Sequence, residues 1–177
     1  MSYEKPFKTI SIPFDLYESK IENYFIGQTP TIIGQPSKAI ALLLNPYNSR
    51  VNIYLNAITI TNLSSSNLSG TIYLKSIATG TNSSLVSCAN IGINPPPIPK
   101  GKIQSSISIN SPLNGIPIFN RIVSPISTLV LDGSQIIISP GESVLVSLGE
   151  LVTTDVNAIV AFGWWEEKIF YYGCYAD

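Results

Sequence analysis

Apolar and polar residues alternate in short runs along most of this chain, as in β-strands with one buried face. Asn45-Pro46, Asp132-Gly133 and Pro140-Gly141 separate several runs, and such pairs favour tight turns. Asp132-Gly133 in particular predicts a two-residue hairpin. We expect strands over residues 24–33, 39–44, 51–62, 69–77, 84–89, 103–110, 117–122, 128–131, 135–138, 143–148 and 158–165.

The run at 158–165 is apolar on both of its faces. One face would carry Ala158, Val160, Phe162 and Trp164, and the other Ile159, Ala161, Gly163 and Trp165. Because both faces need cover, we expect a central strand that is covered within the domain or by another subunit. The run at 143–148 alternates with serine and predicts an ordinary half-buried strand.

Regularly spaced strands and turns, with no helix required, predict an all-β, single-domain β-sandwich of jelly-roll type. A chain of 177 residues is long enough for one hydrophobic core. We place the domain at 23–168, with an extended N-terminal arm over 1–22 and an aromatic C-terminal tail over 169–177.

Apolar residues in the arm alternate as they would in a strand, with room for a short helical turn within 15–22. These residues are Ile10, Ile12, Phe14 and Leu16. We expect them to form a subunit interface, with the arm adding a strand to a neighbouring subunit. The alternatives are a first strand of the same domain and a disordered terminus.

Aromatic residues gather at the end of the chain, namely Trp164, Trp165, Tyr171, Tyr172 and Tyr175. Aromatic side chains in strands usually serve the core or a subunit interface, and we expect that role here. The alternative is a platform that stacks on sugar rings. The tail is too apolar to remain in water, so we expect it to fold back or to dock on a neighbouring copy.

Only 12% of the residues are charged, and the formal net charge is -1. Weak repulsion between copies favours association. The basic residues do not cluster, which argues against nucleic acid, and the apolar runs are too short to span a bilayer. The chain has no histidine, the commonest zinc ligand and general base, so we expect neither metal nor cofactor.

Glu166 and Glu167 are the one pair of adjacent carboxylates. In a strand they would face opposite sides, whereas glycoside hydrolysis needs two carboxylates directed at one sugar. No serine has a histidine or a nucleophile elbow to activate it. We therefore expect no enzymatic activity.

Cys88 and Cys174 leave three alternatives open: two buried free thiols, a bond within the chain, or a bond between subunits. The start of the sequence lacks the long apolar segment of a secretory signal. We expect synthesis in the cytoplasm and release without a signal peptide.

Two segments, LLLNPYNSRVNIYLNAITITNLSSSNLSGTIYL and VAFGWWEE, resemble an uncharacterised family of small jelly-roll proteins from spore-forming Firmicutes. In that family an Asn-Pro turn leads into a strand pair and Gly-Trp-Trp-Glu-Glu closes the domain, and here Asn45-Pro46 and residues 163–167 match. The chain is more loosely similar to endospore appendage subunits, which stack by sheet augmentation and are linked through cysteines in an N-terminal connector. This arm has no cysteine, so such a bond would need Cys88 or Cys174.

The resemblance implies a fold and a spore-forming source but no activity. Together with the low charge, it leads us to expect a structural subunit that forms a pilus-like homopolymer. This extracellular fibre or surface layer would be an endospore appendage with the arm as donor strand, and a spore-surface anchoring protein is a further candidate partner. The alternative is a glycan- or receptor-binding jelly-roll module.

Overall fold

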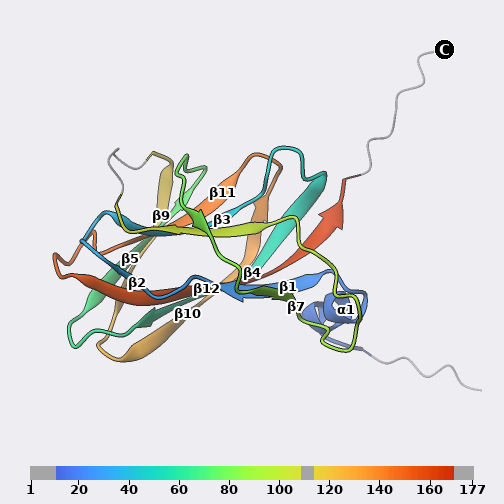
Figure 1. Cartoon of the computed structure of the whole chain (residues 1–177), viewed down its shortest axis with the longest axis horizontal. Coiled ribbons are helices and arrows are strands. Elements are labelled where there is room, and N and C mark those ends of the chain that lie inside the picture. Colours follow the sequence, from blue (N-terminus) through green and yellow to red (C-terminus); the bar gives the residue numbers. More distant parts are fainter. Residues whose placement is uncertain (1–10, 109–113, 170–177) are drawn as a thin grey trace, which may run out of the picture.

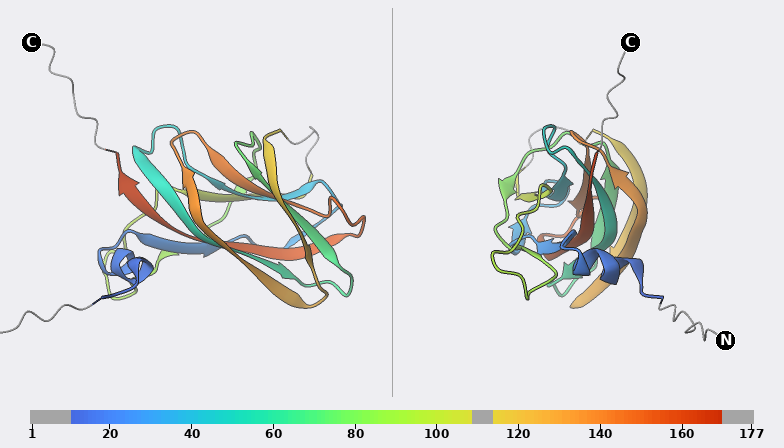
Figure 2. Two further views of the ribbon diagram at one scale, coloured as in Figure 1. Left: turned by 180° about the vertical axis from the view of Figure 1, so that it is seen from behind. Right: turned by 90° about the vertical axis from the view of Figure 1, so that its right-hand side faces the viewer.

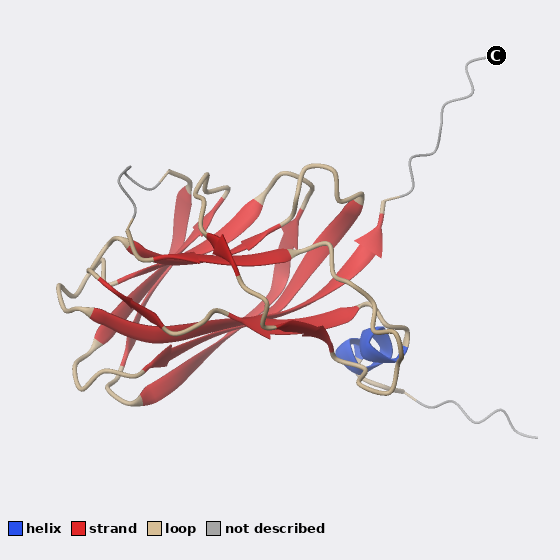
Figure 3. Cartoon of the chain, viewed as in Figure 1, coloured by secondary structure: helices blue, strands red, loops and turns tan. Residues whose placement is uncertain are grey.

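The computed structural model describes residues 11–108 and 114–169, which form two antiparallel β-sheets packed face to face (Figure 1). The short helix α1 lies at one end of the sandwich (Figure 3). The elements are α1 Phe14–Lys20, β1 Tyr24–Gln28, β2 Ile32–Gly34, β3 Ala39–Leu44, β4 Val51–Asn62, β5 Leu68–Leu74, β6 Thr81–Asn82, β7 Val86–Cys88, β8 Lys102–Ser106, β9 Ile116–Val123, β10 Ser127–Ile138, β11 Ser143–Leu148 and β12 Val156–Lys168. The predicted all-β sandwich is confirmed.

The strand order fits a jelly roll. The first sheet has the order β10-β4-β12-β1-β7, with β2 beside the start of β12, and the second has the order β6-β8-β3-β11-β5-β9. The long strands alternate between the two sheets along much of the chain, so the chain wraps around one shared core (Figure 2).

The core lies between the two sheets and is made by the inward rows of their strands. Trp164 is fully buried there, with its ring 6.0 Å from that of Phe25, and Phe162 lies in the same row of β12. Strand β12 pairs with β4 on one side and with β1 on the other, so the predicted central position is confirmed. Burying each large apolar side chain contributes roughly 1.5–3 kcal/mol.

The second sheet is also covered on its outer face. All six residues of β11 are buried, so the predicted half-buried strand was wrong. Ile40, Leu42 and Leu145 form a small outer cluster, against which Ala78 packs from the segment after β5. At Gly80 this segment lies so close to β8 that a Cβ atom would be 2.5 Å from the Ser105 carbonyl oxygen.

The predicted hairpin at Asp132-Gly133 was wrong as well. Strand β10 runs through this pair without turning and keeps its pairing with β4, apart from a bulge between Asp132 and Ile136. Gly133 lies against the partner strand, where a Cβ atom would be 2.7 Å from the Cγ atom of Leu55. The glycine therefore allows a close approach within a bulged strand, rather than a turn.

The predicted extended arm is replaced in part by helix α1, so Phe14 and Leu16 are helical residues. Pro13 stands at the N-terminal cap position, and Asp15 and Lys20 complement the helix dipole in the first and last turns. Ile12 directly precedes the helix, and Ile10 lies outside the described residues. The alternation that suggested a strand was too short to exclude a helix of seven residues.

Asn45 provides a test of how the ends of three strands are joined. Its buried side-chain amide donates to the carbonyl oxygens of Val51 and Ile138, at 2.8 and 2.7 Å. We expect Asn45→Ala to lower the free energy of unfolding by about 2–3 kcal/mol, because two buried carbonyl groups lose their donor. Asn48→Ala, at an exposed position of the same turn, should change it by less than about 0.5 kcal/mol. Urea denaturation measures both, and equal losses would contradict the assigned role.

Candidate functional site

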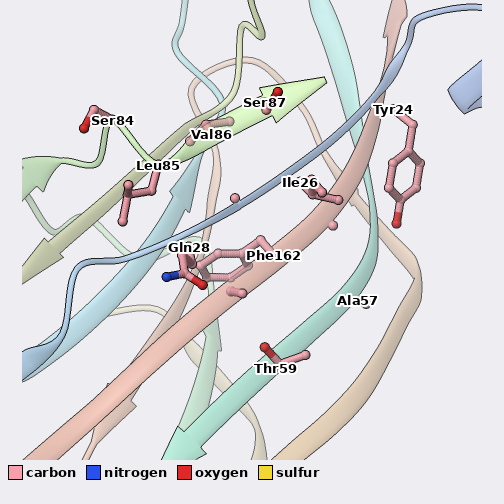
Figure 4. Close-up of a pocket in the computed structure, with 13 residues that line it drawn as sticks. Tyr24, Ile26, Gln28, Ala57, Thr59, Ser84, Leu85, Val86, Ser87 and Phe162 are labelled. Carbon is pink, nitrogen blue, oxygen red and sulfur yellow. The ribbon is translucent and has the colours of Figure 1, made fainter. Parts of the chain in front are cut away.

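The outer face of the first sheet contains a trough of about 670 Å³. Strands β1 and β12 run along it, β4 forms one flank, and the segment that leads into β7 forms the other (Figure 4). Ile26 and Leu85 line the trough with side chains that are 50% and 49% exposed. The site is therefore an open apolar hollow, of a size that suits a segment of chain or a small ligand.

Small residues create this hollow. Ala161 and Gly163 of β12 and Ala57 of β4 line it, and Gly163 pairs with Ala57. A Cβ atom on Gly163 would lie 2.6 Å from the hydroxyl oxygen of Tyr24, so the glycine leaves the space that the Tyr24 side chain occupies. The Tyr24 hydroxyl oxygen in turn accepts a hydrogen bond of 2.8 Å from the side-chain amide of Asn56.

The polar groups of the trough are uncharged. Thr59, Gln28, Ser84 and Ser87 supply hydroxyl and amide groups, and no lining residue in the described part of the chain carries a charge. Such a lining suits a neutral occupant with apolar surface and a few hydroxyl groups. An ionic ligand would lose its hydration there without gaining a counter-charge.

Aromatic side chains fill the neighbouring end of the same face. The ring of Tyr54 stacks on Trp165 at 5.3 Å, and Phe14 of α1 contacts Trp165 edge-on at 5.2 Å. The Tyr54 hydroxyl donates to Glu167, and this hydrogen bond, together with desolvation, raises the pKa of Tyr54. Helix α1 therefore covers the end of β12 that lies beyond the trough.

The two tryptophans do not form the aromatic platform that was the alternative to a core or interface role. Trp164 belongs to the core, and Trp165 is half-buried beneath Tyr54 and Phe14. Leu16 is exposed on the helix and Ile12 is half-buried. Tyr171, Tyr172, Tyr175 and Cys174 lie outside the described residues, so their predicted roles remain predictions.

Glu166 and Glu167 face different surroundings. Glu167 is exposed, whereas Glu166 is only 8% exposed. Both Glu166 carboxylate oxygens accept the Lys100 backbone N–H at 2.9 Å, and Oε1 also accepts the Gly101 N–H at 2.7 Å and the Trp164 indole N–H at 3.0 Å. The carboxylate thus links the loop before β8 to the central strand, and we call this set of hydrogen bonds the Glu166 clamp.

Cys88 is a buried free thiol within the described part of the chain, and its sulfur lies 4.0 Å from the Glu22 carbonyl oxygen. Whether it bonds to Cys174 stays a prediction. Residues 11–108 and 114–169 contain no group of three or more acidic or cysteine side chains that could hold a metal ion. The same ranges include no helix with the length and apolar character that a bilayer crossing requires.

Neither the trough nor the Glu166 clamp was predicted from the sequence. The trough had one usable signal, because small residues recur at outward positions of the central strand. The Glu166 clamp had no signal in the sequence around Glu166, because its carboxylate accepts hydrogen bonds from backbone groups 65 and 66 residues away.

The two adjacent glutamates allow a matched test of the clamp. We expect Glu166→Ala to lower the free energy of unfolding by about 3 kcal/mol, because two buried donors and one partly buried donor lose a charged acceptor. Glu167→Ala should cost less than about 1 kcal/mol, since its hydrogen bond is exposed to water. Thermal or urea denaturation of both variants checks this, and a similar loss in the two would show that the clamp does not stabilise the fold.

Comparison with known proteins gives one match. Searches of curated proteins and of solved structures each found no match. The model of a family of unknown function, DUF6143, matches residues 2–171, which is nearly the whole chain. The protein therefore belongs to the DUF6143 family of unknown function.

Proposed function

We propose that this protein is a structural subunit that assembles with copies of itself into an extracellular fibre or surface layer. The residues before α1 would act as the donor strand, which pairs with a free sheet edge of the next copy. The observation that carries this proposal is a pair of long strand edges on one side of the sandwich, those of β9 and β10, which have no second strand partner within the described residues.

Strands β9 and β10 end their sheets, and neither has a second strand partner within the described residues. One groove of about 190 Å³ is lined by Phe119 and Arg121 of β9 and by Val130 and Leu131 of β10, so the two edges lie side by side. A free edge presents unpaired N–H and C=O groups that can take up another strand. The groove adds an apolar contact for the side chains of that strand.

These edges have few of the features that usually prevent unwanted pairing. Neither strand contains lysine, and each contains one charged residue, Arg121 in β9 and Asp132 in β10. Val130 is 65% exposed. Pro117 and a bulge at Ile118 interrupt the edge of β9, and the bulge after Asp132 interrupts that of β10, so residues 127–132 are the regular segment best suited to accept a donor strand.

The donor would come from the thirteen residues before α1. Fully extended, thirteen residues span roughly 43 Å at ~3.3 Å per residue, which exceeds the length of the six-residue acceptor segment. Ile10 and Ile12 remain candidates for the contact. Phe14 packs against Trp165 of its own chain, so the proposed donor strand ends before it.

The low overall charge supports association, because copies of this chain repel one another weakly. The endospore setting rests on the resemblance of the Gly-Trp-Trp-Glu-Glu segment at 163–167 alone. On this proposal the fibre or layer lies on the endospore surface and is attached there through an anchoring protein.

Removing the donor and blocking the acceptor should have the same effect. We expect a chain without residues 1–12, and separately Val130→Lys, to remain folded and monomeric under conditions where the unaltered chain forms polymers. Lysine at an edge disfavours strand addition. Ile91→Lys serves as the control. Ile91 is 95% exposed in the loop before β8, so this substitution adds the same charge away from the strand edges.

Sedimentation velocity and negative-stain electron microscopy measure the outcome. Polymers of the unaltered chain and of Ile91→Lys, with monomers of the other two, support the proposal. Polymers of the shortened chain would show that the arm is not the connector, and an unaltered chain that stays monomeric would refute self-assembly.

A further inference from the structure

The trough on the first sheet is a second surface without cover in the described structure. Its flanking side chains Ile26 and Leu85 are about half exposed, although its volume of about 670 Å³ is large enough to bury an apolar segment. Exposed apolar hollows of this kind usually mark a binding surface. The edges of β9 and β10 are separate from the trough, because β9 belongs to the second sheet, β10 lies beyond β4, and neither strand lines the trough.

The chain itself contains a segment with matching chemistry. Residues 170–177, FYYGCYAD, follow the described part of β12 and include four aromatic residues and one charged side chain. Aromatic rings suit a floor of small residues such as Ala161 and Ala57, and tyrosine hydroxyl groups suit the uncharged rim at Thr59 and Ser84. A segment with this composition gains by leaving water.

The same segment can reach only the near end of the trough of its own chain, at Gly163, which lies five residues before Lys168, or ~17 Å at ~3.4 Å per residue. Strand β12 ends at Lys168, and Ala161 lies seven residues back, or ~24 Å at ~3.4 Å per residue. Eight residues span ~26 Å when extended, and a reversal uses at least about two of them, which leaves ~20 Å. The returning chain would also have to cross Trp165, where Tyr54 and Phe14 already lie.

We propose that the trough receives residues 170–177 of a second copy of this chain. This inference rests on the self-assembly proposed above, because it needs a neighbouring molecule. It adds a contact that differs from strand addition, since aromatic side chains are buried on the face of a sheet while its edges remain available. Each subunit would then hold its neighbours through two separate segments, one at each end of the chain.

Photocrosslinking in the full-length chain tests this inference. Benzoylphenylalanine replaces Tyr172, and equal amounts of ¹⁴N- and ¹⁵N-labelled protein are mixed before irradiation and analysed by mass spectrometry. We expect mixed-label crosslinks to peptides that contain Ala57, Leu85 or Ala161. Ile26→Glu places a carboxylate in the trough and should reduce these crosslinks roughly tenfold or more. Ile33→Glu is the matched control, because Ile33 is 67% exposed on β2, outside the trough, and should leave their yield unchanged.

Several outcomes would overturn the inference. Crosslinks that join only equal labels would show that the tail binds its own chain, and crosslinks outside the trough would place it elsewhere. An equal yield in the Ile26→Glu and Ile33→Glu variants would exclude the trough. Polymers without trough crosslinks would overturn this inference and leave the donor-strand proposal standing. Dimers that are crosslinked at the trough but never polymerise would overturn the donor-strand proposal and leave this inference standing.

Discussion

Burial of the inward row of β12 is the interaction on which the rest of the structure depends. The strand pairs with β4 and β1 through its backbone, and its Phe162 and Trp164 side chains fill the space between the sheets. The Glu166 clamp extends this role, because it holds the loop before β8 against the same strand. A central strand with this many partners leaves little freedom to the sheets around it.

The surfaces that remain free follow from the same arrangement. Helix α1 covers one end of the outer face through Phe14 and Trp165, and the small residues at Ala161 and Gly163 leave the neighbouring part hollow. The second sheet has its own cover on the outer face. The trough and the edges of β9 and β10 therefore stand out among the described surfaces, and both are apolar and poor in charge.

Much of the fold could be predicted from the sequence, because long strands with clear turn signals carry their own pattern. The ranges 39–44, 51–62 and 143–148 coincide with β3, β4 and β11. The short elements could not be predicted, since β6 has two residues and α1 is too short for a helical period to stand out. Asp132-Gly133 misled the interpretation because a bulge and a hairpin favour the same residues.

The candidate site was less accessible to prediction than the fold. A hollow is defined by side chains that are missing, and its one signal in the sequence was the pair of small residues at alternate positions of β12, Ala161 and Gly163. Trp165 was correctly recognised as an aromatic side chain that needs cover, but its cover came from Phe14, which the alternating pattern had assigned to an extended arm. Contacts between segments far apart in the sequence form both the trough and the cover of Trp165, so neither could be predicted from local pattern.

Hydrogen exchange along β10 tests most directly whether its edge accepts a strand from another copy. Backbone N–H groups that point away from β4 exchange quickly in a free edge and slowly once a second strand accepts their hydrogen bonds. The account predicts that amide exchange within residues 127–132 slows as the protein is concentrated and assembles, while exchange in β4 stays unchanged. Assembly without any slowing in residues 127–132 would contradict it.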